Sequence, residues 1–163
     1  MLDRFRTFVQ LAARNVSHFF REDPHLKSHV ATFSLHRIQL YVGDVEDKNR
    51  QLRKGVSFQL PREGWPINRA AVLSEADASR FVAFLSRLES LELPCSFVFS
   101  REREDIEWKV VRYQEKWHGG GGLVGYLHGN WLADHSNPSK VTITRDAVAD
   151  LRTCIEERYR LAI

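Results

Sequence analysis

Asp105, Glu107 and Lys109 form a D-x-E-x-K pattern at the start of an expected strand. Because side chains alternate along a strand, all three lie on one face. Two carboxylates there could hold a divalent cation while the lysine steadies a water molecule, as in a metal-dependent nuclease. The charge alternation over residues 101–107 is equally typical of an exposed strand edge. Metal-dependent nuclease activity is therefore the weakest of three hypotheses for this chain, and the other two are given below.

His118 precedes four consecutive glycines, which is similar to the oxyanion loop of some esterases. That chemistry needs a nucleophile in a G-x-S-x-G turn, and the chain has no such turn. A phosphate-binding loop would need a Walker-type lysine and hydroxyl, which do not follow. The histidines do not provide a zinc-ligand spacing. We expect no catalytic residue, no metal and no cofactor, and we interpret the glycines as a hairpin loop.

Basic and aromatic residues are interleaved on the expected strands, a mixture that suits single-stranded nucleic acid because rings stack on bases and cations meet phosphates. The segment 48–62 carries five basic residues and no acidic one. A solvated basic loop and aromatics that simply favour strands are the alternatives. The candidate nucleic-acid-binding residues are Arg37, Tyr41, Lys48, Arg50, Arg53, Lys54, Lys109, Tyr113, Lys116 and Trp117.

Strand alternation predicts which of these candidates share a face. Arg37 and Tyr41 are expected on one face of the first strand. Lys109, Tyr113 and Trp117 are expected together on a later strand. Trp108, Val110 and Arg112 are then expected on the opposite face of that later strand.

The composition fits a globular chain of 163 residues with a net charge of +3. It has no apolar run of the roughly 20 residues that a membrane span needs. Cys95 and Cys154 lack metal-site spacing, so we expect buried thiols in a reducing intracellular compartment, cytoplasmic or alternatively mitochondrial. A single disulfide between them stays open.

Hydrophobic periodicity and turn residues divide the chain into two similar halves. The expected elements are a helix over 2–20, strands over 32–45, 53–60 and 70–73, a helix after Ser74, strands over 96–100, 106–117, 123–132 and 140–143, and a helix after Thr144. Ser74 and Asp77 form a capping-box-like pair, and Thr144 is a second N-cap. An offset of 70 residues superposes Ser74 on Thr144 and Gly55 on Gly125.

We therefore predict an α+β fold of two ββββα-like halves with curved antiparallel sheets, each closed by a helix. The expected organisation is a single domain over 1–163, with an N-terminal amphipathic helix over 1–21 and halves over 30–92 and 95–163. The N-terminal helix could pack on the domain, bind a partner or act as an Arg-rich leader. Asp3 and the lack of serine enrichment weigh against a leader.

The stretch 38–60, with Arg53, Lys54 and Gly55 before an alternating strand, resembles the strand–turn–strand of the transcriptional coactivator PC4 family. The segment 140–159 is similar to the end of a Pur-type repeat. These families, with the Whirly and mitochondrial guide-RNA-binding proteins, share a unit of four antiparallel strands and a helix, and their curved sheets bind single-stranded DNA or RNA. The resemblance implies that Lys48, Arg53 and Lys54 contact phosphate and that strand aromatics stack on bases.

The first hypothesis is a non-enzymatic protein that binds single-stranded RNA or DNA through a basic and aromatic sheet face. The second is an interaction or assembly subunit that uses the N-terminal helix to bind a protein partner or itself. The third is the metal-dependent nuclease.

Overall fold

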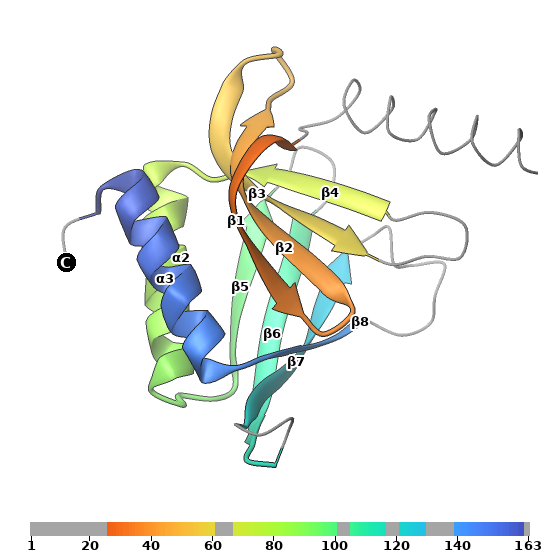
Figure 1. Cartoon of the computed structure of the whole chain (residues 1–163), viewed down its shortest axis with the longest axis vertical. Helices are drawn as coiled ribbons and strands as arrows, with labels where there is room; N and C mark the ends of the chain where they lie inside the picture. The colour runs from red at the N-terminus through yellow and green to blue at the C-terminus, as the bar shows by residue number, and fades with distance from the viewer. Residues whose placement is uncertain (1–25, 61–66, 101–104, 117–120, 130–138, 162–163) are drawn as a thin grey trace, which may run out of the picture.

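The computed structural model describes residues 26–60, 67–100, 105–116, 121–129 and 139–161. Over these residues the fold is α+β, with two antiparallel four-stranded sheets and two helices (Figure 1). The first half consists of β1 (Leu26–Leu35), β2 (Ile38–Glu46), β3 (Leu52–Leu60), β4 (Ile67–Val72) and α2 (Glu75–Glu89). The second half consists of β5 (Cys95–Ser100), β6 (Asp105–Gln114), β7 (Gly122–Gly129), β8 (Ser139–Ile143) and α3 (Arg145–Tyr159).

The first half contains one hairpin more than the predicted strand over 32–45 implies. A two-residue turn at His36 and Arg37 divides that segment, because Leu35 pairs directly with Ile38. His36 takes a φ of 67°, which few residues other than glycine adopt and which lets the chain reverse. A His-Arg pair carries none of the usual hairpin-turn signals, so the prediction of one strand was wrong.

The two helices begin where the capping residues predict. Ser74 accepts a hydrogen bond from the Asp77 backbone N–H at 3.1 Å, and the Asp77 carboxylate accepts one from the Ser74 N–H at 3.3 Å. Thr144 accepts from the Ala147 N–H at 3.2 Å. Each helix spans 15 residues, and the bounds of α3 follow those of α2 at the predicted offset of 70. The local signals that start both helices are therefore confirmed.

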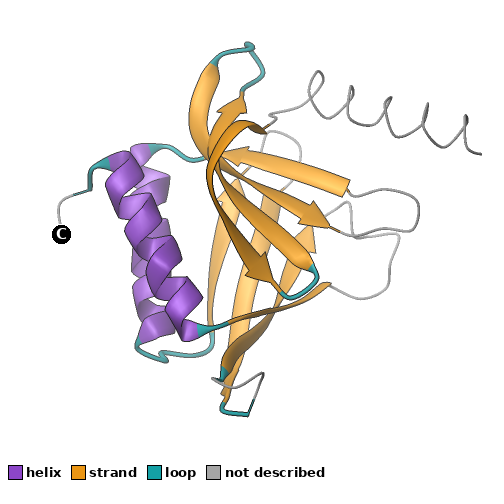
Figure 2. Ribbon diagram, viewed as in Figure 1, coloured by secondary structure: helices purple, strands orange, loops and turns teal. Residues whose placement is uncertain are grey.

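The hydrophobic core lies between both sheets and the helix pair, and its residues come from both halves. The helices lie side by side, and the sheets fan out on one side of them (Figure 2). Phe81 of α2 contacts Phe97, Phe99 and Trp108 of the second sheet, with ring centroids 4.9, 5.1 and 6.4 Å away. The second sheet therefore turns one face to this core; on its other face Lys109 and Lys140 are exposed, whereas Val124 and Thr142 are buried.

The end of α3 fastens the second half to the first sheet. The Tyr159 hydroxyl donates to the Leu73 carbonyl at 2.9 Å, and Lys54 donates to the Arg158 carbonyl at 2.8 Å. Arg158 also forms an ion pair with Asp44 of β2. We call these contacts the α3 latch.

Several expectations fall on residues outside the described ranges. These are the N-terminal helix over 1–21, Trp117, and His118 with the first two glycines of its loop. In the described part of the chain, no helix is long and apolar enough to cross a membrane.

Candidate nucleic-acid interface

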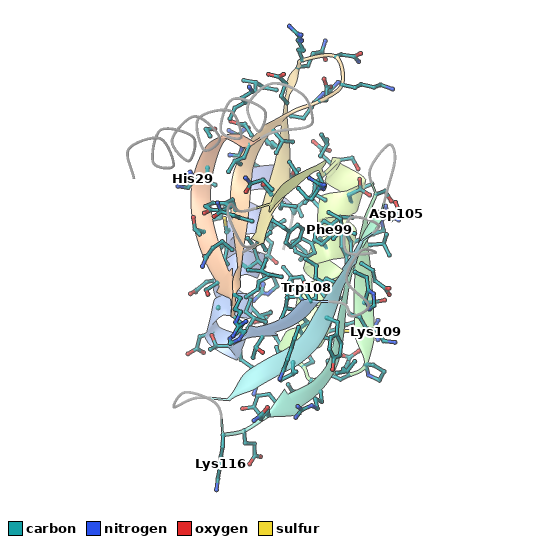
Figure 3. The ribbon with its side chains drawn as sticks, turned by 90° about the vertical axis from the view of Figure 1, so that its right-hand side faces the viewer. His29, Phe99, Asp105, Trp108, Lys109 and Lys116 are labelled. Atoms are coloured by element: carbon teal, nitrogen blue, oxygen red, sulfur yellow. The ribbon has the colours of Figure 1, made fainter. Side chains whose placement is uncertain are left out.

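A row of directly paired residues crosses the outward face of the second sheet. Ser96 of β5 pairs with Lys109 of β6, Lys109 pairs with Tyr126 of β7, and Tyr126 pairs with Lys140 of β8. Both lysines are exposed and the tyrosine is half-buried. Figure 3 shows Lys109 at the surface and Trp108, its neighbour in sequence, in the interior. We call Lys109, Tyr126 and Lys140 the basic–aromatic row.

A bulge in β6 changes the predicted faces beyond this row. Val110 pairs with Gly125, but the next pair is Arg112 with Val124, so Val111 is the extra residue. The bulge moves Arg112 to the outward side with Lys109 and turns Tyr113 toward the core, against which it packs. The prediction that Lys109 and Tyr113 share a face was therefore wrong, because one inserted residue inverts the alternation.

The Tyr113 ring instead lies close to Gly121, immediately before β7 begins. Gly121 has a φ of 74°, and a Cβ placed on it would lie 2.2 Å from the Tyr113 hydroxyl oxygen. Position 121 therefore favours glycine for two reasons: its backbone has a positive φ, and the Tyr113 ring occupies the space of a side chain.

Acidic residues share the outward face. Asp105 pairs with Ser100 and Glu107 pairs with Val98, so the D-x-E-x-K side chains do alternate onto the side of Lys109. Within the described ranges, however, His, Cys, Asp and Glu form no group of three or more that could hold a metal ion. The two carboxylates make the face mixed in charge rather than uniformly basic.

The β2–β3 loop carries three more predicted residues. Its turn covers residues 47–51, because β2 continues to Glu46 and β3 begins at Leu52. Asp47 organises the loop: its carboxylate accepts from the N–H groups of Asn49 and Gln51 at 2.8 and 2.9 Å. The Gln51 N–H is the largest cause of a lowered Asp47 pKa, with further contributions from Asn49 and Arg53.

Lys48, Arg50 and Arg53 are all exposed on or beside this loop. Arg53 forms a 3.3 Å ion pair with Asp47. Lys54, by contrast, belongs to the α3 latch, and its Nζ lies 5.2 Å from the centre of the Tyr159 ring. A phosphate contact by Lys54 would therefore compete with contacts that join the two halves.

Arg37 and Tyr41 do not share a strand face, because Arg37 lies in the β1–β2 turn. Tyr41 lies on the face of the first sheet opposite the main core, where it packs against a small buried cluster of Leu26, Val45 and Ala70 and its hydroxyl donates to Gln59 Oε1 at 2.9 Å. Its ring meets His29 edge to face, with centroids 5.6 Å apart. The hairpin at His36 and Arg37 is the reason that the predicted arrangement was wrong.

The described candidates therefore do not converge on one surface. The β2–β3 loop lies at one end of the molecule and Lys116 at the other (Figures 1 and 3). Lys109 lies on the side of the second sheet, between these ends. The surface that best combines cations with an aromatic ring is the basic–aromatic row.

Two members of that row, Tyr126 and Lys140, were not among the predicted site residues. Alternation along β7 and β8 places them outward, with Leu127 and Val141 inward, and that signal was present in the sequence. Their alignment with Lys109 depends on strand register, which alternation alone does not supply.

The sequence matches no known protein-family model, and a search of curated proteins found no similar protein.

Proposed function

We propose that this protein binds single-stranded nucleic acid on the outward face of its second sheet. The observation that carries the proposal is the basic–aromatic row, in which Tyr126 lies between two exposed lysines on the adjacent strands. Adjacent strands are about 4.8 Å apart, so each lysine backbone lies one such step from the tyrosine. A base can stack on the ring while the ammonium groups meet phosphates on either side.

Two further features support this function. Arg112, on the same side of β6, adds a third cation to the face. The order of four strands and a helix, repeated once, is the unit implied by the resemblance to the PC4, Pur and Whirly families. A sheet face also suits a flexible single strand, since stacking on a ring tolerates any base.

The test is fluorescence anisotropy with a short labelled single-stranded oligonucleotide, titrated at several salt concentrations. Tyr126→Ala should weaken binding about 5- to 150-fold, which corresponds to about 1–3 kcal/mol for one stacked base. Lys109→Gln or Lys140→Gln should weaken binding and reduce the slope of log affinity against log salt by about 0.7 each.

Lys116→Gln is the matched control, because it removes the same charge at a distant point, in the bend that follows β6. It should leave affinity nearly unchanged. The proposal fails if the unsubstituted protein does not bind at low salt. It also fails if Lys116→Gln weakens binding as much as Lys109→Gln, since binding would then reflect overall charge alone.

A further inference from the structure

The four edge strands of the two sheets are β1, β4, β5 and β8, and three of them carry features that hinder pairing with another strand. β1 contains two register shifts and Lys27, β4 contains Arg69, and β8 contains Lys140. Bulges and charged side chains are common protections of sheet edges. β5 has neither, since its sequence CSFVFS is uncharged and its register with β6 is unbroken.

The exposed side of β5 is also partly apolar. Phe97 and Phe99 point into the core, whereas Ser96, Val98 and Ser100 alternate outward. Val98 is 44% exposed at the centre of the strand. Figure 3 shows this strand, in green, at the right-hand margin of the second sheet. The absence of bulges and charges within β5 and its central valine together make this edge suited to pairing.

The sequence of β5 points to the partner. Residues 96–100 read SFVFS, which is the same in both directions. An antiparallel copy related by a two-fold axis at Val98 would place valine opposite valine, serine opposite serine and phenylalanine opposite phenylalanine. In an isologous interface residue i contacts residue j and j contacts i, as in any antiparallel self-pairing, and here that pairing also brings identical residue types together.

The charges beside the edge agree with this pairing. Lys109 pairs with Ser96 and Asp105 pairs with Ser100 within one sheet. Across the two-fold axis, Ser96 meets Ser100 of the second copy, so the row containing Lys109 continues into the row containing Asp105. By symmetry there are two such Lys109–Asp105 attractions, each over three strand spacings or about 14 Å between Cα atoms. Glu107 pairs with Val98 and would face its own copy at the same spacing, so two attractions stand against one repulsion, all weakened by salt.

We propose that two copies of this chain pair edge to edge through antiparallel β5 strands centred on Val98, forming one eight-stranded sheet. This dimer does not require nucleic acid. The two-fold axis is perpendicular to the joined sheet, so both basic–aromatic rows lie on the same side of it. Only the use of these two rows for binding rests on the proposed function.

The first test measures the mass of the full chain in solution, without nucleic acid, by light scattering over a range of concentrations. The unsubstituted protein should approach twice its monomer mass of 19.0 kDa. Val98→Lys should return it to the monomer, because two like charges would face each other across the axis. Val30→Lys is the matched control: Val30 is 57% exposed on the protected edge β1, so the dimer should persist.

The second test fixes the register by disulfide trapping under mild oxidation. Val98→Cys should form a covalent dimer, since directly opposed Cβ atoms are about 4.5–5.5 Å apart, close to disulfide geometry. Ser96→Cys alone should not, whereas an equimolar mixture of Ser96→Cys and Ser100→Cys should crosslink to each other. The unsubstituted chain controls for Cys95 and Cys154.

A protein that stays monomeric at every concentration overturns the proposal. A dimer that Val98→Lys leaves intact also overturns it, because the interface would then lie elsewhere. Crosslinking of Ser96→Cys alone as fast as the mixture refutes the register centred on Val98.

Discussion

Gly125 in the middle of β7 leaves no room for a side chain, which makes Gly125→Ala a direct test of the β6–β7 packing. A Cβ placed on Gly125 would lie 2.0 Å from the Lys109 carbonyl oxygen and 2.7 Å from the Val110 Cα. Both are backbone atoms of the adjacent strand, so no side-chain rotation relieves the contact. The bulge at Val111 lies immediately beyond this crossing and bends β6 there.

The cost follows from the displacement that alanine would require. An ordinary carbon–oxygen contact needs about 3.3 Å or more, so the two strands must separate by roughly 1 Å. Overpacking of this kind costs about 1–3 kcal/mol, and a backbone clash belongs at the upper end, so we expect about 2–3 kcal/mol. For a chain of this size, that lowers the melting temperature by about 4–12 °C.

Thermal and urea unfolding followed by circular dichroism measure this loss. Lys116→Gln, at an exposed position in the bend after β6 and away from β5, is the control and should change stability by less than about 0.5 kcal/mol. If Gly125→Ala is as stable as the control, β6 does not cross Gly125 closely, and the packing described for this pair of strands is incorrect.

Two further predictions concern the helices. Burial alone would raise the pKa of Asp77, but hydrogen bonds from Ser74 and Arg80 outweigh it and hold the pKa below the ordinary range of an aspartate. This contribution to stability is therefore present at neutral pH and is lost in acid, as the pH falls through the lowered pKa and the carboxylate takes up a proton. Asp77→Asn should remove that part of the acid dependence of the melting temperature, and an unchanged acid profile would contradict the assignment. Tyr159→Phe should cost about 1 kcal/mol in urea unfolding because it removes the buried hydrogen bond to the Leu73 carbonyl. Burial raises the pKa of Tyr159, so its hydroxyl stays a donor at neutral pH, and equal stability of the variant would show that the bond adds nothing.

The features that the sequence predicted well are local ones. Ser74 with Asp77 and Thr144 mark helix starts because a capping side chain bonds backbone groups only two or three residues away. The alternation of β5 and β8 was likewise readable within five or six residues. The α+β class and the element order of the second half followed from such signals.

The features that the sequence did not reveal depend on distant partners or weak turn signals. His36 adopts a positive φ in a turn that contains no glycine or asparagine. Val111 is a bulge because the register between β6 and β7 shifts there, and the sequence of β6 alone does not show that register. Lys54 looked like a phosphate contact, yet its hydrogen-bond acceptor at Arg158 is 104 residues away in the sequence. The face of Tyr113 and the role of Lys54 were therefore beyond alternation and composition.

The α3 latch has a consequence for the order in which this chain acquires its structure during synthesis. Asp44 leaves the ribosome 114 residues before its ion-pair partner Arg158, and Leu73 precedes the Tyr159 hydroxyl by 86 residues. Domains tend to fold as units as they emerge. Here the first four strands emerge long before the C-terminal end of α3, which contacts them. The nascent first half therefore keeps part of its apolar face uncovered until the second half has been synthesised.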